Sequence, residues 1–76
     1  MIREHDSVVL TSDLPDEGLR IGDVGAVVHI HNEGEAFEVE FMTLTGKTVT
    51  VTTVPASSCR PVGQADITHA RELRSA

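Results

Sequence analysis

Aromatic residues are scarce in this chain of 76 residues, which contains two phenylalanines and no tryptophan or tyrosine. Base-stacking surfaces and proline-peptide grooves are built from exposed aromatic rings, so the composition disfavours both kinds of recognition. Basic residues are also few, since 6 lysines and arginines stand against 12 aspartates and glutamates, for a formal net charge of −6. A phosphate backbone and an anionic membrane both repel this balance, so we expect neither nucleic acid nor lipid as a direct ligand.

Cysteine occurs once, at Cys59, which excludes an intrachain disulfide framework. A lone thiol fits a reducing compartment, the first residues are polar rather than signal-like, and no apolar run approaches the roughly 20 residues that span a bilayer. We therefore expect a cytoplasmic protein without a membrane segment. A domain of this size buries only about 60% of its unfolded surface. Without disulfides, we expect a homo-oligomer or a protein partner to add stability.

Apolar residues recur at every second position over most of residues 5–54, a period typical of half-buried β-strands. From this period we predict strands at His5–Thr11, Val24–His31, Ala36–Met42 and Lys47–Val54. A last short strand fits at Cys59–Val62, because a proline such as Pro61 is tolerated at a sheet edge. Beyond Gly63, Asp66 is a suitable N-cap for a helix over residues 66–74, with Ile67, Ala70 and Leu73 as its apolar stripe. The chain 1–76 is thus predicted to be one domain, a barrel over residues 5–62 followed by a C-terminal helix.

Three glycines form the most informative local pattern, because they stand at fixed spacing before the second predicted strand. Gly18 and Gly22 lie in a loop that folds back, and Gly25 opens the strand that contains Val27. This pattern indicates a mainly β fold, an SH3-like open barrel of about five antiparallel strands. Two further glycines are expected in turns: Gly34 and Gly46. Three loop residues are too apolar for a free loop and are expected to pack against the barrel end: Leu14, Leu19 and Ile21.

Two predicted turns set the strand register, because paired residues must lie on the same face of a sheet. The loop 32–35 should pair Ile30 with Phe37 and Val28 with Val39. The loop 44–46 has glycine at its third position, as a type I turn followed by a bulge requires. This second loop should pair the following residues: Phe41 with Val49, and Val39 with Val51.

The register predicts which side chains of the sheet face inward and which face solvent. The inward set on the second strand is Val24, Ala26, Val28 and Ile30. The outward set on the same strand is Gly25, Val27, His29 and His31. Val27 is then expected across from Glu40, and His29 across from Glu38. On the fourth strand, Val49 and Val51 should point inward, and the threonines outward: Thr48, Thr50 and Thr52.

The glycine spacing and the first strand, Asp6-Ser-Val-Val-Leu10, resemble the KOW motif of ribosomal and transcription-elongation proteins. The resemblance implies an SH3-like turn and, in those relatives, binding to RNA or RNA polymerase through lysines and arginines in the loops. Here the loops carry carboxylates instead, with Arg20 as their basic residue. Polymerase binding is compatible with this acidity, whereas direct RNA binding is not favoured.

A second resemblance covers nearly the whole chain. The stretches that carry it are Asp6–Thr11, Leu14-Pro15, Gly18-Leu19, Gly22–Gly25, Glu38–Phe41 and Arg60–Val62. On these residues the chain is similar to a family of short bacterial proteins, the domain of unknown function 4926. The resemblance implies a compact SH3-like fold and a bacterial source. It implies no activity.

The histidines offer a candidate metal site. His29 and His31 stand two residues apart on one strand face, a spacing that can hold Zn²⁺ or Ni²⁺, and Glu38 across the ladder offers an oxygen. The alternative is a pair of exposed strand histidines, one of them paired with the glutamate. We favour this alternative, because no third nitrogen or sulfur ligand is assured, and we expect no metal or other cofactor.

Cys59 is a candidate reactive thiol, but nucleophilic catalysis needs a positioned base and an oxyanion site, and neither can be identified. We therefore expect Cys59 to be a small buried apolar residue, and we expect no enzyme activity. The leading hypothesis is a non-catalytic protein-interaction or accessory module that self-associates. Its expected contacts are the edge strands of the barrel and four apolar residues: Val27, Met42, Ile67 and Leu73. The alternatives are a KOW-type nucleic-acid, transcription or ribosome accessory module and a histidine-based metal binder.

Overall fold

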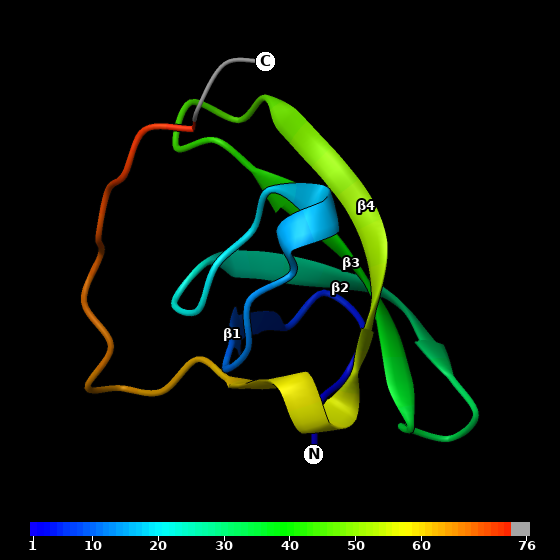
Figure 1. The fold of residues 1–76 in the computed structure, drawn as a ribbon. Coiled ribbons are helices and arrows are strands. Elements are labelled where there is room, and N and C mark those ends of the chain that lie inside the picture. The colour runs from blue at the N-terminus through cyan, green and yellow to red at the C-terminus, as the bar shows by residue number, and fades with distance from the viewer. Residues whose placement is uncertain (74–76) are drawn as a thin grey trace.

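Five antiparallel strands form one curved sheet in the computed structural model, which describes residues 1–73 (Figure 1). The strand order across the sheet is β4-β3-β2-β1-β5. The strands are β1 (Ser7–Leu10), β2 (Val24–His31), β3 (Ala36–Met42), β4 (Thr48–Pro55) and β5 (Cys59–Pro61). Two short 3-10 turns connect them: η1 (Pro15–Glu17) and η2 (Ala56–Ser58). The mainly β prediction is confirmed, and the predicted bounds of β2 and β3 agree with the structure.

The core lies on the concave side of the sheet and is built from all five strands and the loop after η1. Its buried members are Val8, Leu10, Leu19, Val27, Phe37, Val39, Phe41, Val54 and Cys59. Leu14 packs against this cluster, as predicted for the loop, but Ile21 does not and is 63% exposed. The backbone N–H of Ile21 donates to Asp13 Oδ1 at 2.9 Å, so this residue fixes the loop through its backbone while its side chain faces solvent.

A β-bulge in β2 reverses the predicted faces of its first half. Val27 pairs with Val39 and is fully buried, whereas Val28 is the extra residue of the bulge and is 41% exposed. The predictions that Val28 faces inward and that Val27 is exposed are therefore wrong. Beyond the bulge the register agrees with the prediction, since His29 pairs with Glu38 and Ile30 with Phe37. The extra residue reverses which side chains face the core on one side of the bulge. The order of residue types along the strand does not reveal this reversal, so the strand looks uninterrupted in the sequence.

A second bulge, at the start of β4, shifts the β3–β4 register by one residue from the prediction. Phe41 pairs with Thr50, Val39 with Thr52 and Glu40 with Val51. As a result Thr50 and Thr52 are half-buried on the core side, whereas Val49 and Val51 are exposed. The prediction had these faces the other way round. The chain prefers this register because it places Val54, which is fully buried, opposite Phe37 in the core.

The two predicted turns are confirmed in length. His31 pairs with Ala36 around the loop 32–35, and the N–H of Thr43 donates to the carbonyl of Lys47 at 2.8 Å around the loop 44–46. Gly46 has φ +93°, the left-handed conformation that this turn requires. The other turn glycines with positive φ are Gly18, Gly22 and Gly34.

Gly25 serves a different purpose from the turn glycines, because its backbone conformation is ordinary for a strand. A Cβ atom on Gly25 would lie 2.5 Å from Cγ1 of Val39 and 2.9 Å from the carbonyl oxygen of Glu40. The absence of a side chain at Gly25 therefore lets β2 and β3 approach closely at the core.

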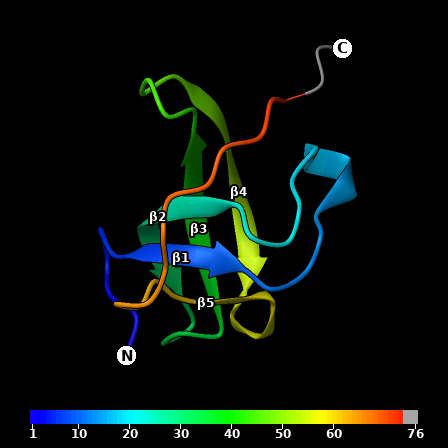
Figure 2. The ribbon, with the colours of Figure 1, turned by 90° about the vertical axis from the view of Figure 1, so that its left-hand side faces the viewer.

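The predicted helix over residues 66–74 does not form in the described residues. Residues 62–73 are here called the strap: after a turn at residues 63–66, residues 67–73 run without regular secondary structure, and Arg74 lies outside the described residues. The strap crosses β1 and β2 (Figure 2). Two physical reasons act against the helix. The Asp66 carboxylate is engaged by Arg60 and the N–H of Gly63, and Ile67 is 89% exposed, so no surface covers the expected stripe of this short segment.

Candidate functional site

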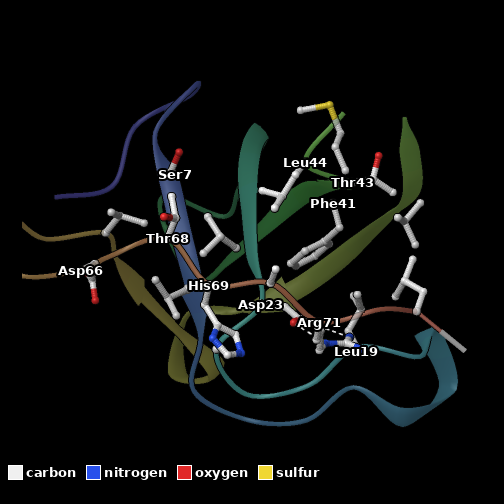
Figure 3. A pocket seen from close by; sticks show the side chains of 18 of the residues that line it. Ser7, Leu19, Asp23, Phe41, Thr43, Leu44, Asp66, Thr68, His69 and Arg71 are labelled. Carbon is white, nitrogen blue, oxygen red and sulfur yellow. Dashed lines mark hydrogen bonds and ion pairs between the residues drawn. The ribbon is translucent and has the colours of Figure 1, made fainter. Parts of the chain in front are cut away.

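A groove of about 720 Å³ lies between the strap and the sheet (Figure 3). On the sheet it is lined by Ser7 and Val9 of β1 and by Val24 at the start of β2, which face away from the core. The tip of the β3–β4 hairpin and the strap form its other walls. Those walls contribute the following residues: Phe41, Met42, Leu44, Val49, Ile67 and Leu73. The groove is thus a mainly apolar channel, open to solvent and bridged by an extended segment.

Three of the four predicted interaction residues meet at this groove. Met42 lies on the hairpin, whereas Ile67 and Leu73 lie on the strap, and all three side chains are exposed. The fourth, Val27, is a fully buried core residue, because the bulge at Val28 turns its side chain inward. The prediction of Val27 as a contact is therefore wrong. The sequence reasoning missed Val24 and Leu44, both exposed residues of the same groove. An apolar residue at a turn tip, such as Leu44, was the available signal.

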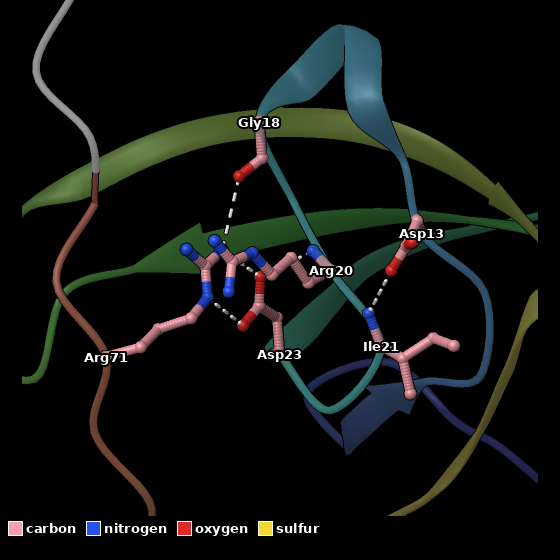
Figure 4. A network of polar contacts seen from close by, with 6 residues as sticks. All are labelled: Asp13, Gly18, Arg20, Ile21, Asp23 and Arg71. Carbon is pink, nitrogen blue, oxygen red and sulfur yellow. Dashed lines mark hydrogen bonds and ion pairs between the residues drawn. The ribbon is translucent and has the colours of Figure 1, made fainter.

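An arginine–aspartate clasp holds the far end of the strap (Figure 4). Arg71 donates from Nε to Asp23 Oδ1 at 2.8 Å and from its terminal nitrogen Nη2 to Asp23 Oδ2, and Nη2 also donates to the carbonyl of Gly18 at 3.2 Å. Burial raises the pKa of Asp23, but the bonds from Arg71 and from the N–H of Arg20 outweigh it and leave the pKa below its usual range. The strap is therefore tied to the glycine loop by a charged pair that is about four-fifths buried, with side-chain exposures of 21% and 17%.

A second clasp holds the near end. Arg60 of β5 donates to both carboxylate oxygens of Asp66, at 2.9 Å and 2.8 Å. Asp66 also accepts the N–H of Gly63 at 2.6 Å, and these bonds hold its pKa far below its usual range. The two clasps leave the intervening strap residues 67–70 bridging the groove between them.

Asp23 and Asp66 sit in turns of the same kind, as does Asp6. In each turn the aspartate accepts an N–H from the residue three positions earlier and returns its own N–H to that residue's carbonyl. Such local bonds are characteristic of aspartate in turns. The aspartate spacing was therefore a usable signal for the turns. Nothing local in the sequence indicates that Arg71 pairs with Asp23, because 48 positions separate them.

The histidines lie together on the outer face, as predicted, but they engage two different glutamates. The rings of His29 and His31 are 4.7 Å apart in an edge-to-face arrangement. Nε2 of His31 lies 3.3 Å from Glu38, and Nδ1 of His29 lies 3.9 Å from Glu4. Bonds from Thr53 and His31 lower the pKa of Glu38. Residues 1–73 contain no group of three or more histidine, cysteine, aspartate or glutamate side chains placed to hold a metal ion.

Cys59 is buried in the core cluster, with its thiol 3.8 Å from the carbonyl of Pro55, and burial raises its pKa. A raised pKa keeps the sulfur as the less reactive thiol at neutral pH. This is the packing role predicted for Cys59.

The comparison with family models matches residues 4–61 to the domain of unknown function DUF4926. The chain belongs to this family. Searches of curated proteins and of solved structures find no match. The match covers all five strands and includes Asp23 and Arg60, whereas the strap with Asp66 and Arg71 follows it. No helix among the described residues is long and apolar enough to cross a membrane.

Proposed function

We propose that this DUF4926 domain is a non-catalytic protein-interaction module whose groove receives an extended apolar segment of a partner protein. The observation that carries the proposal is the apolar groove that the strap already bridges in extended form. Because a stretch of this chain spans it, its shape suits another extended segment of similar width. Exposed apolar side chains gathered along one groove are typical of interaction sites.

The charge of the domain indicates what flanks the partner's apolar residues. The chain has a net charge of −6, and opposite charge steers association between proteins. A segment with basic residues beside its apolar ones therefore fits best. Nucleic acid fits less well, because the two arginines beside the groove, Arg60 and Arg71, are already bound to carboxylates. The same ion pairs support a role without catalysis, since they engage four of the charged side chains that line the groove: Asp23, Arg60, Asp66 and Arg71.

We propose in addition that the sheet is an SH3-like open barrel. The support is topological: β2, β3 and β4 form a meander, η2 follows β4, and β5 returns to pair with β1. The curvature of the sheet around one core agrees with this architecture (Figure 1).

Peptide display tests the proposed docking directly. A library of random extended peptides would be selected on the domain, and the enriched peptides measured against variants. We expect apolar peptides with basic flanks, whose affinity falls at least tenfold in Leu44→Asp. Val28→Asp is the matched control, since Val28 is exposed at the bulge and does not line the groove. Failure to enrich any peptide, or equal binding by both variants, would contradict the proposal.

A further inference from the structure

The edge strand β4 has backbone groups that no other strand uses. β4 stands at the end of the sheet order, with β3 as its neighbour. Within residues 1–73 no other strand pairs with its opposite side. An edge of this kind is a template for another strand unless the protein protects it.

The backbone bonds indicate which residues of β4 face the free side. The N–H of Ala56 donates to the carbonyl of Glu35 at 2.9 Å, so this pair is one of the hydrogen-bonded pairs that alternate along an antiparallel ladder. Counting back by two along the observed register, Val54 and Thr52 bond to β3. Val51 and Thr53 therefore direct their N–H and C=O groups away from the sheet. Pro55, which has no N–H, falls at an outward position, as proline does in edge strands.

The ends of β4 carry two devices that protect an edge, the bulge at Val49 and Pro55, but its centre carries none. Residues 48–54 are all threonine or valine, the residue types that most favour strands, and no charge occurs between Lys47 and Arg60. Charged residues within an edge strand are a common device against pairing. Val51, at the centre, is 48% exposed on the outer face.

We propose that β4 pairs antiparallel with β4 of a second copy of this chain, around a two-fold axis at Val51. In this register Val51 faces its own equivalent and Val49 faces Thr53, so the outward backbone groups of both copies bond to each other. A two-fold axis requires such a self-complementary surface. The occupant is a second copy because this edge is its own complement: rotated about Val51, the same uncharged valines and threonines face each other, so the strands of two acidic chains meet without a like charge between them.

The side chains around β4 leave its outward backbone groups free to pair; the line of contact between the two β4 strands is here called the seam. On the core side, the hydroxyl of Thr50 donates to Glu17 at 2.9 Å, a contact that uses no backbone group of β4. On the outer side, Thr48 and Thr53 donate to Glu40 and Glu38, each at 2.6 Å. These carboxylates flank the seam in both copies. Salt screens their repulsion, so association is expected to strengthen as ionic strength rises.

One strand edge is smaller than a standard protein interface of roughly 1,200–2,000 Å². The association is therefore expected to be weak and to require a high protein concentration. The pairing would leave the groove accessible in each copy, so the dimer and the proposed docking function are separate claims.

Light scattering after size exclusion tests the proposal on the full chain. We expect a mass of twice 8.2 kDa at high concentration and in 0.5 M salt. Val51→Lys should keep the chain at 8.2 kDa, with at least a tenfold weaker association, and circular dichroism should show that it remains folded. Val28→Lys, a matched exposed valine, should associate as the wild type does. A monomeric wild type, or association unchanged by Val51→Lys, would overturn the proposal.

Oxidative cross-linking tests the register itself. Residues in a hydrogen-bonded antiparallel pair have Cα atoms about 5.5 Å apart, within the range that disulfides span. Val51→Cys should therefore form a covalent dimer rapidly, whereas Val28→Cys should not. Equal cross-linking at both positions, or none, would contradict the pairing. Peptide binding by Val51→Lys keeps the two proposals distinguishable, because a failed dimer leaves groove binding intact and a failed groove leaves the dimer intact.

Discussion

The sheet and the strap place their apolar side chains in opposite ways. The sheet buries Val8, Leu10 and Val39 almost completely and joins its strands by a continuous backbone ladder. The strap exposes Ile67 and Leu73 and is tied down by two arginine–aspartate clasps. Burial of apolar surface stabilises a fold strongly, whereas an ion pair gains little net free energy, because its two charges lose contact with water. The difference teaches that the two regions should respond separately to mutation, salt and acid.

The largest expected effect comes from truncation of the core. Leu10→Ala should lower the free energy of unfolding by about 2–5 kcal/mol, because it removes a side chain that is 1% exposed and leaves a cavity. Urea denaturation followed by circular dichroism measures this change. Ile67→Ala on the strap is the control and should stay within about 0.5 kcal/mol. Similar losses at both positions would mean that the strap is part of the core.

The bulge in β2 predicts a smaller but sharper contrast between two adjacent valines. Val27→Thr places a hydroxyl in the core and should cost about 1–3 kcal/mol of unfolding free energy, because no partner is available there. Val28→Thr, at the exposed bulge, should change stability by less than about 0.5 kcal/mol. Urea denaturation of both variants compares them directly. A larger loss of unfolding free energy in Val28→Thr than in Val27→Thr would contradict the bulge and favour the alternating register that the sequence suggests.

Loss of the Asp23–Arg71 clasp is expected to free the strap while changing the stability of the sheet little. Asp23→Asn should release the strap, so trypsin should cleave after Arg71 several-fold faster, while the urea midpoint of the sheet changes little. Asp16→Asn removes the same charge from η1 and serves as the control. If cleavage after Arg71 is unchanged in Asp23→Asn, the clasp does not hold the strap.

Acid should weaken the clasps of the strap before it unfolds the sheet. The native pKa values of Asp23 and Asp66 lie below the ordinary value of 3.8. Groups with a depressed native pKa stabilise the folded form fully above the unfolded value and lose this contribution as pH falls through the native one. The clasps should therefore weaken progressively below about pH 4, and the Asp23 clasp should open first, because Asp66 keeps its charge to a lower pH. Amide spectra between pH 6 and pH 2.5 would show strap resonances moving first; simultaneous movement of strand resonances would contradict this order.

The sheet was largely predictable because its signals are local. The period-two pattern located β2 and β3, and Gly46 identified the three-residue loop at Leu44–Gly46. The two bulges were not predictable from this pattern, because an extra residue leaves the alternation of side-chain types intact while it reverses their faces. The choice of Val27 over Val28 for the core depends on the close approach of β2 to β3 at Gly25, a tertiary effect.

The groove was only partly predictable. Met42, Ile67 and Leu73 were identified as exposed apolar residues, but the helix assigned to the strap gave them the wrong geometry. Asp66 was interpreted as a helix cap because an aspartate before an apolar stripe fits both a cap and a turn. The competing bond to Arg60 decides between the two, and it depends on where β5 places that arginine.

The separate attachment of the strap can be measured most directly on the side chain of Arg71 in the wild-type chain. Its Nε–H, which donates to Asp23, gives its own signal in a proton–nitrogen spectrum, alongside the amides of β2 and β3. We predict that rising urea moves the Arg71 signal to its free position while the strand amides keep their native positions. A common midpoint for the Arg71 signal and the strand amides would contradict the account, because the strap and the sheet would then be one cooperative unit.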